Sequence, residues 1–366
     1  MDTGLDALRE RGFDLLDGKR FGLLCNQATI ASDRKHILDL VSPAVILGPQ
    51  HGLWGHTQDN MIEWEGAPDP RFQAPIYSLY GERRAPDPTW LEGLDLLVVD
   101  VPDVGSRYYT FAWSMALCMG VCERIGLPML VLDRPNPIGG EIVEGPGVSI
   151  GYESFVGLHS VPIRHGMTLG EIAQDLRGRF YRNLDLAVEP VRGWDRWQMA
   201  HDTGLPWAMP SPNLPTPDTA LVYPGGCLLE GTNLSEGRGT TRPFETVGAP
   251  WLDGWALADA MNGLGLPGVW FRPIQFQPTF QKHAGAICEG CFVHVTDRFA
   301  FRPVQTYAHL LQTAWRLSGG KMAWKQPPYE YELVKMPIDI LWGSSALRSA
   351  IEAGDAVSIP GEGLAR

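Results

Sequence analysis

The sequence predicts an α/β protein with a parallel sheet in its first half and a smaller α+β domain after it. In the first half, apolar segments alternate with helical patterns, and a polar cluster follows each apolar segment. After residue 206 the strand and helix signals become shorter and mixed. The chain has 366 residues, which is enough for two or three domains with cores of their own.

The elements of the first domain follow from apolar periodicity. Strands are expected at 20–26, 44–48, 94–101, 129–137 and 184–191. Helices are expected at 33–41, 114–128 and 167–181, with a short one before residue 94. Gly126 and Pro128 are typical of a helix end. Continuous apolar strands separated by helices are typical of a parallel sheet that is covered on both faces.

A segment rich in Pro, Ser, Asn and Thr between 206 and 226 predicts the domain connection. The expected domains are therefore residues 1–205 and 206–366. In the second domain we expect helices at 257–266 and 305–317, and strands at 268–280 and 291–297.

The composition limits the possible partners. A net charge of -12 argues against nucleic acid and against anionic membranes as partners. No apolar segment is long enough to cross a bilayer, and the start of the chain lacks the pattern of a signal peptide. Most of the 6 cysteines lie in apolar segments, as is typical of reduced thiols. We therefore expect a cytoplasmic protein whose partner is a small molecule; the oligomeric state is not predicted.

Polar residues follow each of the first four strands. They are Asn26 after the first, Gln50 and His51 after the second, Asp100 and Asp103 after the third, and Asp133, Arg134 and Asn136 after the fourth. Ligands of open parallel sheets bind outside the carboxyl ends of the strands. The clusters therefore predict a binding site at this edge, although the Gly-x-Gly-x-x-Gly signature of nucleotide binding does not follow the first strand.

Glu63 is the leading candidate for proton transfer. It lies beside Trp64 and soon after Gln58 and Asn60. An indole ring that partly desolvates a carboxyl group raises its pKa, as a general acid in glycoside cleavage requires. The alternative is an ordinary surface glutamate. The 13 tryptophans would suit a carbohydrate ligand, but they would equally suit a core.

Two further segments combine charge with glycine or tyrosine. In residues 230–245, two arginines could bind a carboxylate, or arginine–glutamate pairs could simply hold the loop. In residues 99–111, Arg107 could bind a ligand or pair with Asp103. Thr168 and Glu171 form a capping-box pattern, which favours a structural role for Glu171.

Other chemistries find little support. No His-x-x-x-His spacing predicts a metal site, and Cys288 and Cys291 form a single Cys-x-x-Cys, more typical of a reduced structural pair than of zinc. The sequence gives only weak support for a serine hydrolase. We expect neither a metal nor another cofactor.

A series of motifs then resembles a known family. They are, in order, NQATI, GPQHGLWG, QDNMIE, IYSLYGERRAP, DVPDVGSRYYTF, LDRPNPIGG, SFVGLHSVPIRHGMTLGE, SPNLPTPDTALVYPG and LEGTNLSEGRGTTRPFE. Together they resemble the family long called DUF1343. Its characterised members are NamZ-type exo-β-N-acetylmuramidases, which release N-acetylmuramic acid from the non-reducing end of peptidoglycan fragments.

The resemblance implies a Rossmann-like N-terminal domain, a smaller C-terminal domain and an active site in the cleft between them. It implies catalytic roles for Glu63, as the acid/base, and for His51, Asp103 and Tyr108. It implies that Arg238 and Arg242 bind the lactyl carboxylate and that Glu230 and Glu236 orient them. The other expected substrate contacts are Asn26, Gln50, Gln58, Asn60, Asp100, Arg107, Asp133, Arg134, Asn136, His165, Asn213 and Asn233.

One position departs from the family pattern. Many members carry Pro-Glu-His-Gly where this chain has Pro49-Gln50-His51-Gly52, and a glutamine cannot exchange a proton in that role. We expect altered substrate choice in a cytosolic enzyme that acts on recycled fragments. The alternatives are a sugar-binding protein that lost catalysis at Gln50 and a metal-dependent hydrolase.

Overall fold

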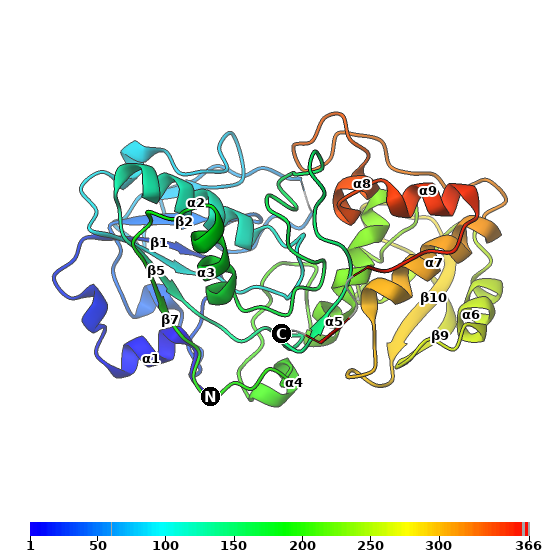
Figure 1. The fold of residues 1–366 in the computed structure, drawn as a ribbon, viewed down its shortest axis with the longest axis horizontal. Helices are drawn as coiled ribbons and strands as arrows, with labels where there is room; N and C mark the ends of the chain where they lie inside the picture. The colour runs from blue at the N-terminus through cyan, green and yellow to red at the C-terminus, as the bar shows by residue number, and fades with distance from the viewer. Residues whose placement is uncertain (60, 361–362, 365–366) are drawn as a thin grey trace. The chain divides into compact units, whose positions relative to one another are not determined.

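The computed structural model describes residues 1–59, 61–360, 363 and 364 (Figure 1). The chain divides into two compact units. The first unit comprises Met1–Gly105, Tyr109–Glu141 and Gly166–Pro212. The second unit comprises Ser106–Tyr108, Ile142–His165 and Asn213–Arg366. The expected boundary at residues 205 and 206 assigns two of these segments, 106–108 and 142–165, to the first domain.

Backbone pairing accounts for the place of those two segments. Arg164 forms bridges to both Ser106 and Glu144, so 106–108 and 142–165 are joined to each other. The Arg164 and Glu144 side chains are both fully buried, with Nη1 and Oε2 3.5 Å apart. A buried charge is stable only when it is paired, so this contact fixes the two ends of segment 142–165 against each other.

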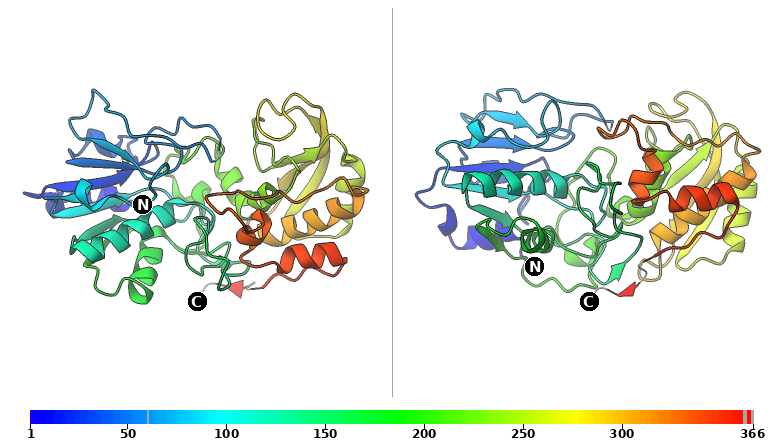
Figure 2. Two further views of the ribbon diagram at one scale, coloured as in Figure 1. Left: turned by 90° about the horizontal axis from the view of Figure 1, so that it is seen from above. Right: turned by 45° about the horizontal axis from the view of Figure 1, so that its top comes forward.

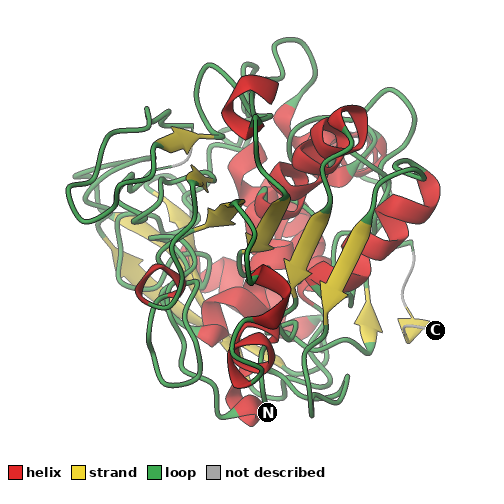
Figure 3. Cartoon of the chain, turned by 90° about the vertical axis from the view of Figure 1, so that its left-hand side faces the viewer, coloured by secondary structure: helices red, strands yellow, loops and turns green. Residues whose placement is uncertain are grey.

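The first unit is built on a six-stranded parallel sheet with the order β3-β2-β1-β4-β5-β7. Its strands, seen as adjacent yellow arrows in Figure 3, are β1 (Phe21–Cys25), β2 (Val45–Gly48), β3 (Ile76–Ser78), β4 (Leu96–Asp100), β5 (Met129–Leu132) and β7 (Leu186–Glu189). Every residue of β1, β2, β4 and β5 is buried, as expected of strands covered on both faces. The predicted α/β class with a parallel sheet is confirmed.

The helices of the first unit follow local signals. They are α1 (Gly4–Glu10), α2 (Phe111–Ile125), α3 (Leu169–Arg179) and α4 (Ala200–Thr203), with 3-10 turns η1 (Asp14–Leu16), η2 (Ile37–Asp39) and η3 (Pro88–Leu91). Gly126 ends α2 in the left-handed conformation, and Thr168 and Glu171 form the predicted capping box of α3. Helices α2 and α3 pack side by side (Figure 2).

The predicted helix at 33–41 is wrong, because only the 3-10 turn η2 forms there. The chain reverses first, with Ile30 bridged to His36 and Arg34 at a φ of 72°. His36 then binds two backbone groups, since Nε2 lies 2.8 Å from Asn26 O and Nδ1 accepts from Leu38 N at 3.3 Å. These local bonds compete with those of a helix.

The second unit contains a three-stranded antiparallel sheet with the order β8-β10-β9. Its strands are β8 (Thr246–Ala249), β9 (Val269–Phe276) and β10 (Cys288–Val295), and a separate short pair joins β6 (Ile142–Val143) to β11 (Gly363–Leu364). Its helices are α5 (Pro217–Gly226), η4 (Cys227–Gly231), α6 (Gly254–Gly263), α7 (Pro303–Leu317), α8 (Pro337–Trp342) and α9 (Ala346–Ala353). Helices α6 and α7 lie beside this sheet (Figure 1).

Both cysteines of the Cys-x-x-Cys motif lie on β10 and are free. Successive side chains of a strand point to opposite faces, so Cys288 and Cys291 face opposite sides of the sheet. They therefore do not converge on one ion. No helix within the described residues has the length and apolarity needed to cross a membrane.

Candidate active site

A pocket lies at the carboxyl edge of the parallel sheet. The sheet order reverses between β1 and β4, the kind of switch point at which α/β proteins bind ligands. The pocket has a volume of about 90 Å³. It is lined by Thr3, Ala28, Ile30, Ala31, Ser32, Pro102, Asp103, Arg134, Pro135, Pro137, Ala200, Thr203, Leu205, Pro206, Trp207, Ala208 and Pro210. Of the predicted site residues, Asp103 and Arg134 thus share one pocket.

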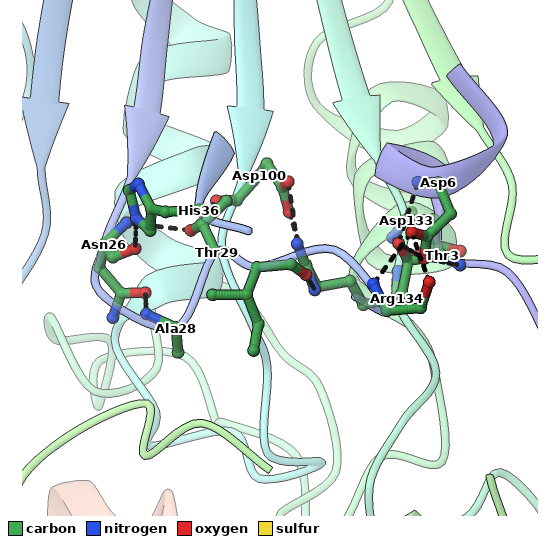
Figure 4. A network of polar contacts seen from close by, with 12 residues as sticks. Thr3, Asp6, Asn26, Ala28, Thr29, His36, Asp100, Asp133 and Arg134 are labelled. Atoms are coloured by element: carbon green, nitrogen blue, oxygen red, sulfur yellow. Dashed lines mark hydrogen bonds and ion pairs between the residues drawn. The ribbon is translucent and has the colours of Figure 1, made fainter. Parts of the chain in front are cut away.

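Arg134 is held by a buried aspartate (Figure 4). Its Nε and Nη2 donate to the two oxygens of Asp100 at 2.5 and 2.9 Å, and its Nη1 donates to Ile30 O at 3.0 Å. Asp100 is fully buried, so its charge depends on this pair. The pair fixes Arg134 at the pocket wall, and it leaves Asp100 as a positioning group.

Asp133 anchors helix α3. Its carboxylate accepts hydrogen bonds from Thr168 Oγ1 and Gly170 N, each at 2.8 Å, and from Arg134 N at 2.9 Å. Burial raises its pKa to about 6, against these hydrogen bonds, which lower it. A Cβ at Gly170 would lie 2.7 Å from the carboxyl carbon of Asp133, so this close approach requires glycine.

Two asparagines hold the loops around the pocket. Asn26 Nδ2 donates to Pro210 O at 2.9 Å, and its Oδ1 accepts from Ala28 N at 3.1 Å. Asn136 Nδ2 donates to Met167 O at 2.9 Å, and its Oδ1 accepts from Ile138 N at 3.1 Å. Both amides are thus used to shape the site.

Gln50 and His51 are buried directly after β2. Thr110 Oγ1 donates to Gln50 Oε1 at 2.6 Å. His51 has a φ of 69°, which is strained for a residue with a Cβ, and its Nδ1 lies 2.8 Å from Thr57 O. A carbonyl can only accept, so Nδ1 holds the proton and the lone pair of neutral His51 lies on Nε2.

Glu63 is exposed, and the expectation that Trp64 desolvates it is wrong. Trp64 is buried, and its Nε1 donates to Pro49 O at 2.9 Å. Glu63 lines an open groove of about 550 Å³, whose other lining residues include Trp64, Glu65, Tyr77, Glu82 and Trp90. The rings of Tyr77 and Trp90 stack there, with centroids 4.2 Å apart.

The two carboxyl groups predicted to be catalytic in the first unit line different hollows. Asp103 lines the switch-point pocket, is 7% exposed and accepts from Gly105 N at 2.6 Å. Glu63 lines the groove beside β3 at the sheet edge. Gln58 is exposed, and Asn60 lies outside the described residues.

The predicted residues Arg107 and Tyr108 belong to the second unit, where both are buried. Arg107 donates to three backbone carbonyls, those of Pro146, Val161 and Leu341. Tyr108 donates its hydroxyl proton to Pro224 O at 2.7 Å, and burial raises its pKa. These contacts indicate structural roles. His165 and Asn213 are also buried in this unit.

The glycine-rich segment of the second unit forms a buried charge cluster. Arg238 Nη2 donates to Glu230 Oε1 at 2.8 Å, and its Nε lies 3.3 Å from Glu236 Oε1. Glu230 also accepts from Tyr329 Oη at 2.6 Å, and Glu236 accepts from Lys282 Nζ at 2.8 Å. The predicted contact of both glutamates with Arg238 is present.

Arg242 is held differently from Arg238. Arg242 pairs with Glu245, because its Nε donates to Glu245 Oε1 at 3.0 Å. The expectation that Glu230 and Glu236 orient Arg242 is therefore wrong. Asn233 joins two backbone segments, since Nδ2 donates to Lys321 O and Oδ1 accepts from Ala323 N, each at 2.9 Å.

Sequence reasoning missed Lys282 and Tyr329, which complete the charge cluster. Tyr329 follows Glu230 by 99 residues and Lys282 follows Glu236 by 46 residues, and neither lies in a recognisable motif. Within the part of the chain that the structure describes, no three His, Cys, Asp or Glu side chains converge as a metal site would require.

Comparisons with known proteins agree with this architecture. Residues 21–218 match the model of the N-terminal part of the exo-β-N-acetylmuramidase NamZ, and residues 221–359 match its C-terminal part. The chain is 40% identical over 364 residues to the peptidoglycan β-N-acetylmuramidase NamZ of Bacillus subtilis (strain 168), covering 98% of this chain and 86% of that one.

Two solved structures from Bacteroides fragilis NCTC 9343 are similar, and both are DUF1343 family proteins. One has a TM-score of 0.85 at 32% identity and covers 96% of this chain and 91% of its own. The other has a TM-score of 0.72 at 28% identity, and the match covers 97% of this chain and 91% of that one. The chain therefore belongs to the NamZ family of exo-β-N-acetylmuramidases, also called DUF1343, and is a glycoside hydrolase.

Proposed function

We propose that the protein is an exo-acting enzyme that releases N-acetylmuramic acid from the ends of peptidoglycan fragments. The observation that supports this most is the 40% identity to the Bacillus subtilis peptidoglycan β-N-acetylmuramidase along 98% of the chain. A match of that length includes both units and every predicted site residue that the structure describes.

We assign the acid/base role to Glu63. Its exposed carboxyl group can reach a ligand in the groove of about 550 Å³, and the Tyr77–Trp90 pair lines the same groove. Aromatic rings beside carboxylates suit a sugar, which has apolar faces and polar edges. Glycoside hydrolysis usually employs two carboxyl groups that flank one bond. Asp103 lines the other hollow, so we propose it as the alternative acid/base and not as the partner of Glu63.

In this proposal, the remaining predicted residues of the first unit hold the backbone and the side chains of the site in place. Asn26, Asn136 and Asp133 hold the loops and helix α3. Arg134, fixed by Asp100, presents its guanidinium edge at the switch-point pocket. A site held by such buried contacts needs little reordering when a substrate binds.

The proposed activity can be tested with chromogenic sugars. We expect the protein to release para-nitrophenol from the β-glycoside of N-acetylmuramic acid and not from that of N-acetylglucosamine, which lacks the lactyl group. Equal release of para-nitrophenol from both glycosides would contradict a specificity for N-acetylmuramic acid. The proposed activity is refuted if the protein releases para-nitrophenol from neither glycoside and also releases no N-acetylmuramic acid from a reduced disaccharide fragment.

The alternative of a sugar-binding protein that lost catalysis at Gln50 runs against the family of the chain, and one measurement tests it. The buried amide of Gln50 accepts from Thr110 and cannot exchange a proton. Calorimetry with the disaccharide would then show binding while no sugar is released. The cytosolic location also remains a proposal, supported by six free and buried cysteines, and cell fractionation tests it.

A further inference from the structure

The charge cluster of the second unit contains a cation that sequence analysis did not consider. Lys325 lies on a segment that pairs with the glycine-rich motif, because Lys325 N donates to Gly231 O at 2.9 Å and Asn233 N donates to Ala323 O at 3.0 Å. Thr232 and Trp324 form the bridge between these two bonds. The backbone of Lys325 is thus fixed to the motif.

The neighbouring tryptophan determines which way Lys325 points. Trp324 is buried, stacks on Trp315 with centroids 5.1 Å apart, and donates its Nε1 proton to Glu352 at 2.9 Å. Side chains alternate between the two sides of an extended segment, so Lys325 projects to the other side. There its Nζ lies 5.0 Å from the ring centroid of Tyr329, whose hydroxyl binds Glu230.

The other cations of the cluster are already balanced. Arg238 is paired with Glu230 and Glu236, and Lys282 donates to Glu236 and to the carbonyls of Leu229 and Leu234. Two cations and two carboxylates thus neutralise one another. An incoming carboxylate that bound Arg238 would have to displace a buried glutamate, which is costly.

Lys325 differs from these two cations. It is half-buried, and burial lowers the pKa of its ammonium group, while Glu230 and Glu236 attract the charged form. Among the residues that the structure describes, no oxygen accepts a hydrogen bond from Nζ and no carboxylate lies within ion-pair distance of it. A desolvated ammonium with three N–H groups gains more from an anionic partner than one in water does.

We propose that Lys325 binds the carboxylate of the substrate, which is the lactyl carboxylate if the proposed muramidase function holds. The role assigned from the sequence to Arg238 and Arg242 thereby moves to Lys325. Arg238, Lys282 and their glutamates then serve as the rigid and neutral surroundings of this ammonium. Tyr329 supports the Lys325 side chain through its ring.

The test compares two substrates that differ only in charge, the para-nitrophenyl β-glycoside of N-acetylmuramic acid and the amide of its lactyl group. Lys325→Met should raise KM for the acid by about 10- to 100-fold, the effect of losing one charge-assisted hydrogen bond, and should leave KM for the amide within about twofold. Lys325→Arg should restore part of the preference for the acid. Lys321→Met removes an exposed lysine from the same segment and should change neither value.

Three outcomes would overturn the proposal. The first is that Lys325→Met raises KM equally for the acid and the amide, and the second is that it changes KM for neither. The third is that the wild-type enzyme does not prefer the acid to the amide. If the wild-type protein cleaves neither substrate, the proposed function fails on its own. In that case, calorimetry with free N-acetylmuramic acid and its amide tests the carboxylate site by itself. The site is supported if Lys325→Met weakens binding of the acid and leaves binding of the amide unchanged.

Discussion

Arg134 and Asp100 form a two-pronged ion pair across the ends of neighbouring strands, with Nε 2.5 Å from Oδ1 and Nη2 2.9 Å from Oδ2. Asp100 is the last residue of β4, and Arg134 follows β5 by two positions. The third bond of Arg134, to Ile30 O, reaches the loop after β1. One side chain therefore joins three of the segments that surround the switch-point pocket.

Removing the cation of this pair should destabilise the protein. Arg134→Met leaves the fully buried carboxylate of Asp100 without its partner, which costs about 3–5 kcal/mol. Urea denaturation at pH 7 measures the free energy of unfolding. The double variant Arg134→Met/Asp100→Asn should recover a large part of the loss, because no charge then remains unpaired. A loss below about 1 kcal/mol in the single variant would contradict a structural role for the pair.

Glu63→Gln should remove proton transfer while the groove keeps its shape. We expect kcat on the muramic acid glycoside to fall by about 10²- to 10⁴-fold, with KM nearly unchanged, because the amide cannot donate a proton. Glu92→Gln changes an exposed glutamate of the same unit and serves as the control. If Glu63→Gln retains full activity and Asp103→Asn loses it, the acid/base belongs to the switch-point pocket instead.

Gln50→Glu places a carboxyl group at a site that is 7% exposed. Thr110 can still donate to it, but burial raises the pKa of a carboxyl group. We expect the variant to be less stable at pH 8 than at pH 5, and its activity to gain an ionisation that the wild-type profile lacks. The matched control is Gln73→Glu, at an exposed position. Parallel pH profiles of the wild type and Gln50→Glu would show that position 50 is not electrostatically linked to catalysis.

Asp133 should make stability fall as pH rises. Burial raises its folded pKa to about 6 from an ordinary value of 3.8, so the folded state binds this proton more tightly than the unfolded state does. Its contribution is fully present below about pH 4 and is lost as pH rises through about 6, by roughly 3 kcal/mol. Asp133→Asn should abolish this slope.

The free energy of unfolding is measured for the wild type and each variant at several pH values between 4 and 7. The difference between the wild type and each variant is then followed as a function of pH. Asp39→Asn, at an exposed position, should leave the pH dependence of the wild type intact. Identical slopes for the wild type and Asp133→Asn would show that Asp133 ionises in the folded state as readily as it does in water.

The sequence by itself determined the elements whose causes lie close together in the chain. Buried parallel strands appear as continuous apolar segments, so β1, β2, β4 and β5 could be predicted. The capping box of Thr168 and Glu171 spans only three residues. The helix expected at 33–41 failed because His36 binds the backbone of Asn26 and Leu38, a competition that apolar periodicity does not reveal.

Only the tertiary structure decided which polar groups bind one another. Glu63 and Trp64 are neighbours in the sequence, but Glu63 is exposed while Trp64 is buried, so the expected desolvation does not occur. Glu230 and Tyr329 are 99 residues apart and share a hydrogen bond. A charge is satisfied by whichever partner the fold brings near it, and that partner's distance along the chain has no bearing on the energy. The sequence therefore determined five of the six parallel strands, the polar residues at their ends and the family, but it did not predict β3. The folded chain decided which charges neutralise one another and which charge is available to a substrate.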